Sequence, residues 1–114
     1  MRKHDEVLLH DMLTAVDAIK RFTSGTTYSH FAANEMMHQA VIRELEIIGE
    51  AARSVSDALQ DAQPEIAWAQ IVGMRNRLIH AYSKVDLGIV WEIVQIDLPV
   101  LEQQVKRILG EEVQ

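Results

Sequence analysis

Apolar residues recur at three- and four-residue intervals in four stretches of the chain, which is the period of amphipathic helices. The first stretch predicts a helix over residues 4–23, and the poor helix formers of residues 23–27 end it. The second and longest stretch predicts a helix that extends from Met37 through Leu59. Gly49 lies inside this helix at a cost of about 1 kcal/mol relative to alanine. Two alanines follow it closely, so we expect another helix to approach the chain there.

The third predicted helix follows a break in the apolar pattern at Pro64. It opens with Pro64 and Glu65, which are residue types favoured in the first turn of a helix. Ile71 and Leu78 lie on its predicted apolar face, which continues to Tyr82.

The fourth predicted helix runs from Leu87 to about Leu109. Asp86 precedes it as a candidate N-cap, and Gly110 follows it as a candidate helix end. Pro99 has no amide hydrogen and clashes with the preceding turn, so we expect this helix to be kinked or broken near it.

No strand pattern competes with these helices. The chain has no alternating apolar run of useful length and no Asn-Gly or Asp-Gly hairpin signal. Its 114 residues suit one domain with one core. Four helices with short connections pack by default as an antiparallel up-down bundle. We therefore expect an all-α domain over residues 1–114, built from four main helices with the last one kinked or broken at Pro99.

Composition excludes several kinds of site and location. The chain has no cysteine, which excludes disulfides, cysteine-ligated zinc, iron–sulfur clusters and a thiol nucleophile. The longest apolar run, residues 87–91, is far shorter than the roughly 18 residues that span a bilayer, so no membrane contact is expected. Charged residues rather than an apolar segment follow Met1, so we expect no signal peptide and a cytoplasmic location.

The charge of the chain is unevenly distributed. A net charge of −6 argues against a general nucleic-acid coating protein. Residues 67–85, however, contain no acidic side chain and carry Arg75, Arg77 and Lys84. A basic island in an acidic chain indicates a focused anion site. A window of this length can also lack acids by chance, so the charge pattern alone leaves both interpretations open.

The histidines do not form a metal-binding pattern. Glu35 and His38 have the Glu-x-x-His spacing of di-iron helical bundles, but such sites need a second copy and two further glutamates, and the chain has only one copy. His4, His10 and His30 lie near the chain ends or in linkers, where we expect solvated surface roles. The chain also has no P-loop, Gly-x-Ser-x-Gly or Gly-x-Gly-x-x-Gly motif.

Four side chains with distinct chemistry lie close together inside the acid-free window: Arg75, Asn76, His80 and Tyr82. Arginine offers a fixed fork of donors to a phosphate. Histidine can give and take protons near neutral pH. Together these two groups can cleave a phosphodiester without a metal ion.

The helical positions of these residues place a condition on such a site. Asn76 and His80 lie about 40° apart around a helix, but Arg75 and His80 lie about 140° apart and do not share a face. Either the long arginine reaches around the helix, or a symmetry-related copy supplies the second group across a dimer cleft. The structural alternative is a helix end at which His80 interacts with the helix dipole and Arg75 is solvated.

The spacing Arg75-x4-His80-x-Tyr82 resembles the signature of HEPN-superfamily toxins, specifically the HepT-like ribonucleases. Other stretches resemble that family in the expected order, although Gly88 is an unusual choice for the first turn of a helix. These stretches are residues 43–52, the whole of residues 68–82, residues 90–92 and residues 97–99.

The resemblance implies a helical bundle that forms a homodimer with two copies of the motif in a shared cleft. It implies a metal-independent endoribonuclease without a cofactor, acting on RNA as the toxin of a type VII-like toxin–antitoxin pair. The implied partner is a minimal nucleotidyltransferase antitoxin that uses ATP to add AMP to the motif tyrosine, here Tyr82. In this chemistry the RNA 2′-hydroxyl attacks the adjacent phosphorus, His80 moves protons and Arg75 stabilises the developing charge, with Asn76 and Arg77 in support.

Two alternatives remain at this point. Some HEPN domains partner a nucleotidyltransferase as non-catalytic modules that bind a nucleotide or substrate. A purely structural dimerisation bundle would make the motif incidental. The intact Arg75 and His80 weigh against the non-catalytic module, and a structural bundle would keep its function when both residues are replaced.

Overall fold

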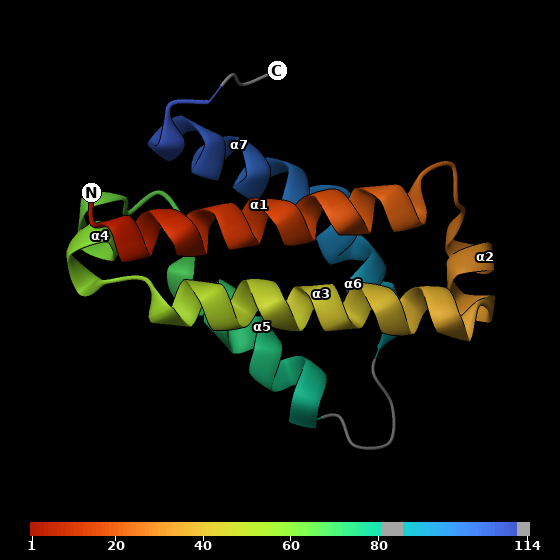
Figure 1. The fold of residues 1–114 in the computed structure, drawn as a ribbon. Coiled ribbons are helices and arrows are strands. Elements are labelled where there is room, and N and C mark those ends of the chain that lie inside the picture. The colour runs from red at the N-terminus through yellow and green to blue at the C-terminus, as the bar shows by residue number, and fades with distance from the viewer. Residues whose placement is uncertain (81–85, 112–114) are drawn as a thin grey trace.

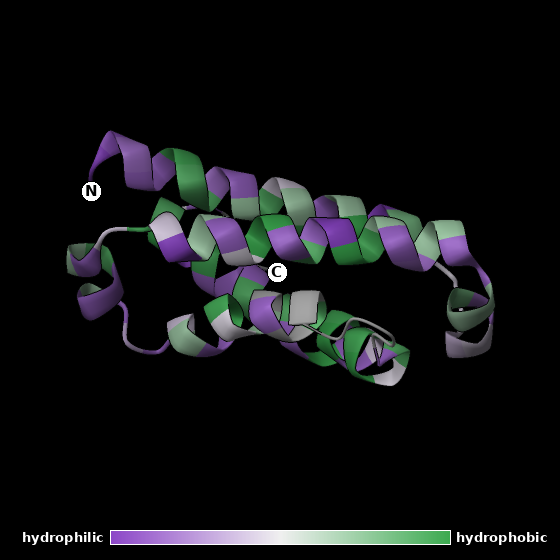
Figure 2. Ribbon diagram, turned by 90° about the horizontal axis from the view of Figure 1, so that it is seen from below, coloured by the Kyte–Doolittle hydropathy of each residue, from purple (hydrophilic) through white to green (hydrophobic). Residues whose placement is uncertain are grey.

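Two long antiparallel helices, α1 (Lys3–Thr23) and α3 (Glu35–Ser54), lie side by side along the centre of the molecule (Figure 1). This computed structural model describes residues 1–80 and 86–111. The side chains of four residues in the first range lie outside the description: Arg75, Arg77, Ile79 and His80. Figure 2 shows polar and apolar residues alternating along both long helices, as expected for helices that bury one stripe.

Three shorter helices extend this pair. α2 (Tyr28–Ala33) connects α1 to α3, and α4 (Asp57–Ala62) follows α3. The chain then returns along the long helices as α5 (Trp68–His80), which packs against α3. Gly49 is buried on α3, which packs against both α1 and α5.

The last helical stretch is broken close to Pro99, as predicted. It consists of α6 (Leu87–Glu92), the π-helical segment η1 (Ile93–Asp97) and α7 (Leu98–Leu109), which packs against α1. The first amide of α7 donates to the first carbonyl of η1, five residues earlier. Because Pro99 has no amide hydrogen, it cannot continue the regular ladder, and the extra residue of the π-turn accommodates this loss.

Both predicted ends of this stretch are confirmed. The Asp86 side chain accepts hydrogen bonds from the amides of Gly88 and Ile89, at 2.9 and 3.2 Å, and so caps α6. Gly110 ends α7 with a left-handed φ of 73°, a conformation that favours glycine. The first predicted helix is also confirmed, since α1 ends at Thr23.

One apolar core joins the helices, and the described residues form no β-strand. The all-α prediction is therefore confirmed. Burying each large apolar side chain contributes about 1.5–3 kcal/mol, so this core is the main source of stability. The largest fully buried side chains come from α1, α2, α3, α6 and α7: Leu9, Met12, Val16, Ile19, Phe31, Val41, Leu45, Ile48, Val90 and Val105.

The second predicted helix is wrong at its end, because α3 stops at Ser54 rather than continuing through Leu59. Ser56 interrupts it: its hydroxyl accepts a hydrogen bond from the Leu59 amide at 3.2 Å and caps α4. The Ser56 amide itself donates to the Asp5 carboxylate at 2.9 Å, so it does not donate to a carbonyl of α3. A long-range contact therefore ends α3 where local periodicity favoured its continuation.

The third predicted helix begins too early in the sequence-based interpretation. Pro64 and Glu65 lie in a turn, and α5 starts at Trp68. The carbonyl of Gln63 holds this turn, because it accepts from the Ile66 amide at 3.3 Å and from the Trp68 indole at 3.0 Å. The predicted end of this helix at Tyr82 lies outside the described residues.

Helix α2 was not predicted. Six residues are too few to show a helical period, and the segment followed a run of poor helix formers. It forms because Thr27 caps its start, accepting from the His30 amide at 3.2 Å, and because Phe31 is fully buried. His30 therefore lies in a helix rather than in a linker, and its side chain is exposed, as expected.

Candidate functional site

Helix α5 carries the predicted motif, and its N-terminal end is firmly anchored. Trp68, its first residue, is buried, and its indole donates to the Gln63 carbonyl. The side-chain amide of Gln104 on α7 donates to the Glu65 carbonyl at 3.1 Å and ties the preceding turn to the last helix. These contacts fix the start of α5. Because a helix rises by a constant amount per residue, they also fix the positions of residues 75–80 along its axis.

Burial along α5 shows which of its faces is free. Met74 and Leu78 are buried one turn apart, whereas Asn76, midway between them, is exposed. Position 80 lies one turn beyond Asn76 and about 40° from it around the axis, so the two positions share the outer face. The structure thus confirms a continuous helix through the motif from Arg75 to His80.

The contacts proposed between the side chains of the motif stay predictions. Of the predicted site residues, Asn76 alone has a described side chain, and it is exposed. The side chains of Arg75, Arg77 and His80, and the whole of Tyr82, lie outside the described residues.

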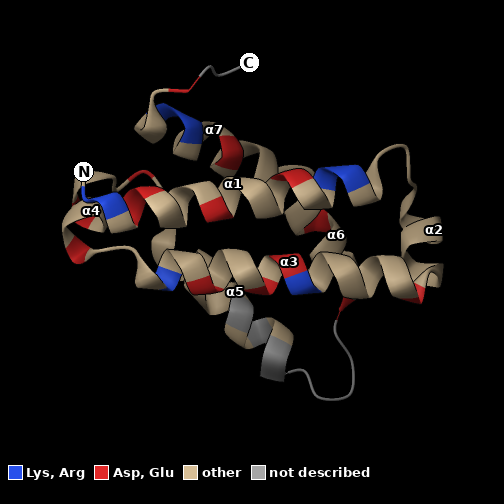
Figure 3. Ribbon diagram, in the orientation of Figure 1, with Lys and Arg blue, Asp and Glu red and all other residues tan. Residues whose placement is uncertain are grey.

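Helix α5 contains no acidic residue, whereas both long helices carry several. Figure 3 shows acids on α1, α3, α4 and α7, whereas the sequence of α5 contains none. The acid-free window of residues 67–85 therefore corresponds mainly to this single helix. A phosphate approaching α5 meets less repulsion than it would on the acidic surfaces of α1 and α3.

An apolar groove of about 780 Å³ lies beside the motif helix, between α5 and the η1–α7 stretch. Ile71 and Met74 line it from α5, and Ile96 and Val100 line it from the other side. Ile96 is 59% exposed and Val100 is 56% exposed. Gly73 also lines the groove, and a Cβ atom built on it would meet no atom within 4 Å. The groove is thus an open apolar surface alongside the candidate site.

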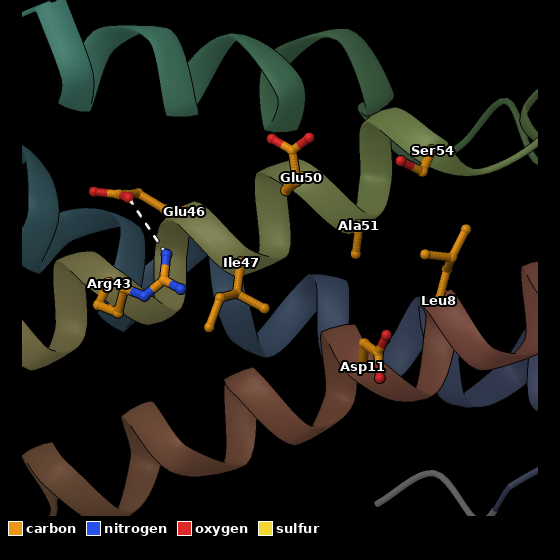
Figure 4. A pocket seen from close by; sticks show the side chains of 8 residues that line it. All are labelled: Leu8, Asp11, Arg43, Glu46, Ile47, Glu50, Ala51 and Ser54. Carbon is orange, nitrogen blue, oxygen red and sulfur yellow. Dashed lines mark ion pairs between the residues drawn. The ribbon is translucent and has the colours of Figure 1, made fainter.

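A second hollow, of about 430 Å³, lies between α1 and α3 (Figure 4). Its polar walls carry three carboxylates, Asp11, Glu46 and Glu50, and one guanidinium, Arg43. Arg43 is already paired with Glu46 at 3.8 Å. This excess of negative charge disfavours a phosphate ligand, so we do not place the nucleic-acid site there.

The described residues give no support to a metal site at Glu35 and His38. Among the side chains that the structure describes, no three His, Asp or Glu residues group as they would around an ion. His38 instead has a structural contact, with its Nδ1 atom 3.2 Å from the Phe31 carbonyl. In the described ranges 1–80 and 86–111, no helix has the length and apolar character needed to cross a bilayer.

Two features of the surface were missed by sequence reasoning. The first is the apolar groove, for which a signal was present: residues 93–101 place apolar side chains on more than one face of a helix. The second is Tyr28 on α2, an exposed aromatic residue that contacts Trp91 on α6. No local pattern marks Tyr28, because its position depends on a helix 63 residues further along the chain.

Comparison with known proteins gives consistent matches over nearly the whole chain. The "Ribonuclease HepT-like" family matches residues 12–108. "Putative RNase MJ1380" of Methanocaldococcus jannaschii is 38% identical over 107 residues, which cover 93% of this chain and 98% of that protein. "Probable ribonuclease HepT" of Thermococcus cleftensis is 34% identical over 108 residues, covering 95% and 98% of the two chains. "Putative RNase TTE0752" of Caldanaerobacter subterraneus is 33% identical over 111 residues, covering 97% and 96%. No solved structure matches the chain.

Proposed function

Because this chain belongs to the ribonuclease HepT-like family, we propose that it is a metal-independent endoribonuclease whose catalytic residues are Arg75 and His80. The observation that carries the proposal is the geometry of α5. The helix is continuous through the motif, buries Met74 and Leu78, and exposes Asn76. Helical geometry sets position 80 about 40° from Asn76 around the axis. RNA can approach that side of the helix without unfolding the core.

The proposed reaction moves one proton and exchanges one P–O bond. The RNA 2′-oxygen attacks the adjacent phosphorus as neutral His80 takes the 2′-hydroxyl proton. The bond from phosphorus to the 5′-oxygen then breaks, and the leaving oxygen takes a proton from the imidazolium. The products are a 2′,3′-cyclic phosphate and a 5′-hydroxyl. Arg75 stabilises the charge on the phosphoryl oxygens, and Asn76 and Arg77 support this arrangement.

We also propose that the active form is a homodimer. Positions 75 and 80 lie about 140° apart on α5, so two copies of the motif in one cleft would supply both groups to one phosphate. The apolar groove beside α5 supports this proposal. Ile96 and Val100 both line this groove and are more than half exposed, and a second copy seated there would cover them. We therefore place the second copy in this groove.

The biological role we propose is that of a toxin in a type VII-like toxin–antitoxin pair. A minimal nucleotidyltransferase antitoxin would transfer AMP from ATP to the Tyr82 hydroxyl and release pyrophosphate. The added phosphate would bring negative charge and a bulky nucleoside next to the basic island formed by Arg75, Arg77 and Lys84. RNA phosphates would then be repelled from the same region.

A single assay tests the nuclease proposal. The purified protein is incubated with single-stranded RNA in excess EDTA, and the cleaved ends are identified by mass spectrometry. Cleavage that continues in EDTA and leaves 2′,3′-cyclic phosphate ends supports the proposal. A clean dimer that binds RNA without cutting it would instead favour a non-catalytic HEPN module.

A further inference from the structure

Helix α2 holds one aromatic side chain in a fixed and exposed position. Asn34 ends α2 and also begins α3, where its side chain accepts from the Met37 amide at 3.0 Å. Phe31 is fully buried and is the only buried residue among the described residues of α2. Tyr28, three residues before Phe31, is 43% exposed. The backbone of Tyr28 is therefore fixed while much of its side chain remains accessible.

An aromatic cluster packs against the Tyr28 ring on its protein side. Its ring lies edge-to-face with Trp91, at 6.1 Å between centroids and 64° between planes. Trp91 in turn packs on Phe31 at 5.1 Å, and Phe31 contacts the His38 ring at 6.0 Å. These contacts join α2, α3 and α6. An aromatic ring held in this way loses little conformational entropy when a ligand binds to it.

Gly88, which has no side chain, lies next to Tyr28 on the surface. A Cβ atom on Gly88 would lie 3.9 Å from the Tyr28 hydroxyl and 3.2 Å from Oδ1 of Asp86. Gly88 is exposed in the first turn of α6, where a glycine is otherwise unfavourable. A side chain here would crowd the Asp86 carboxylate that caps α6, and its absence keeps the surface beside the Tyr28 hydroxyl uncovered.

This surface lies within reach of the motif helix. Gly88 follows His80, the last residue of α5, by eight positions, so their Cα atoms are no more than about 29 Å apart. The Asp86 carboxylate beside Tyr28 is occupied by the amides that it caps. A ligand here would therefore be held by ring contact rather than by charge, with phosphate binding left to the basic island formed by Arg75, Arg77 and Lys84.

We propose that Tyr28 stacks on a nucleobase of the RNA substrate, a few nucleotides from the bond that is cut. This inference rests on the proposed ribonuclease function and assigns the site a second contact on a different helix. Aromatic stacking accepts any base, because every base has a π face. Tyr28 would thus strengthen RNA binding without selecting a particular sequence, and it would act on binding rather than on bond cleavage.

The test measures RNA binding with cleavage removed. The affinity of a fluorescein-labelled single-stranded RNA is measured by anisotropy in the full-length His80→Ala protein, with and without Tyr28→Ala. Removing one stacking ring should weaken binding roughly 5- to 150-fold. Tyr28→Phe keeps the ring and should bind as tightly as its parent. The matched control is Phe22→Ala, because Phe22 is exposed to a similar extent, 37%, and is not part of the aromatic cluster.

An abasic scan distinguishes stacking from a general loss of structure. A series of RNAs that each lack one base should contain a position whose loss weakens binding to the parent but causes no further loss with Tyr28→Ala. Tyr28→Leu, which keeps apolar packing on Trp91, replaces the alanine variant if thermal unfolding shows that alanine destabilises the fold. Equal affinity of the Tyr28→Ala and Phe22→Ala proteins, or additive losses at every abasic position, would overturn the proposal.

The wild-type protein separates the two possible failures. If it cleaves RNA while the Tyr28 variants bind as the parent does, the nuclease proposal stands and the stacking site is rejected. If the wild-type protein neither binds nor cleaves RNA, both proposals are rejected. If a Tyr28 variant loses binding to a partner protein but keeps its affinity for RNA, the stacking site is also rejected.

Discussion

The carboxylate of Asp5 accepts two hydrogen bonds from Ser56, one from the backbone amide at 2.9 Å and one from the hydroxyl at 2.6 Å. These residues are 51 positions apart, and Asp5 is buried. The contact fastens the start of α1 to the cap of α4. Burial by itself raises the pKa of Asp5, but the hydrogen bonds from Ser56 and the positive charges of Arg2 and His4 outweigh it. The pKa of Asp5 is therefore below its usual value.

This contact predicts a pH-dependent loss of stability. Asp5→Asn should lower the free energy of unfolding by about 1–3 kcal/mol near neutral pH, because a neutral amide with one acceptor oxygen replaces the charged carboxylate that accepts both hydrogen bonds from Ser56. A carboxylate with a lowered pKa stabilises the fold above its usual pKa, and this contribution is lost as the pH falls through the folded-state pKa. The difference between the wild type and Asp5→Asn should therefore shrink below about pH 4. Urea unfolding followed by circular dichroism at several pH values measures it.

The control for this experiment is Asp17→Asn. Asp17 is exposed and pairs with Arg21 at 3.4 Å on the surface of α1, a type of pair that contributes little. Equal stability of the wild type and both variants near neutral pH would contradict the prediction, as would a difference that grows in acid.

Periodicity and capping chemistry predicted the helices whose limits depend on neighbouring residues. The cap at Asp86, the end at Gly110 and the interruption near Pro99 all follow from local backbone chemistry. The limits that depend on tertiary or side-chain contacts were wrong. The end of α3 depends on Asp5, 51 positions from Ser56. The start of α5 depends on the hydrogen bond from the Trp68 indole to the Gln63 carbonyl, which an apolar period does not describe.

The candidate site was predictable as a motif but not as a surface. The sequence placed Arg75 and His80 on one helix, and α5 has that extent. The groove needed the packing of η1 and α7 beside α5, which a single helix pattern does not describe. Tyr28 needed the fold of α2 onto α6, although 63 residues separate it from Trp91.

Replacing His80 should abolish most RNA cleavage and leave the fold intact. Loss of an acid–base group commonly costs about 10²- to 10⁴-fold in rate. His80→Ala should therefore cut RNA at least 100-fold more slowly in EDTA, with an unchanged circular dichroism spectrum. His10→Ala serves as the control, because His10 is exposed on α1 and should not affect the rate. A His80→Ala protein that cleaves as fast as His10→Ala would show that the cleavage comes from another residue or from a contaminant.

A charge placed in the groove beside α5 should separate the dimer. Ile96→Glu introduces a carboxylate that would be buried against a second copy, at a cost of several kcal/mol if it stays unpaired. We expect the wild type to sediment as a dimer at micromolar concentration, and Ile96→Glu as a folded monomer with reduced RNA cleavage. Val7→Glu is the matched control, because Val7 is a 50% exposed aliphatic residue on α1, outside the groove. A wild-type monomer that cleaves RNA fully would contradict a shared active site.

Tyr82 is the proposed control point for the toxin. Tyr82→Phe should keep the fold and much of the RNase activity, because the phenol has no part in the proposed proton transfers. It should escape neutralisation by a minimal nucleotidyltransferase and ATP, since the phenylalanine ring offers no hydroxyl to receive AMP. Intact mass spectrometry after this treatment should show added AMP on the wild-type protein and none on Tyr82→Phe. RNase assays on the same samples should show loss of activity in the wild type alone.

The chain supplies an internal control for this last experiment, because it contains two tyrosines. The tyrosine other than Tyr82 is Tyr28, which is exposed on α2 and also offers a phenol to the transferase. Tyr28→Phe should gain AMP and lose activity as the wild type does, if position 82 is the modified one. The same mass gain on Tyr82→Phe as on the wild type would assign the modification elsewhere. Loss of activity without any gain in mass would mean that the antitoxin acts by binding alone, and the proposed chemistry at Tyr82 would be rejected.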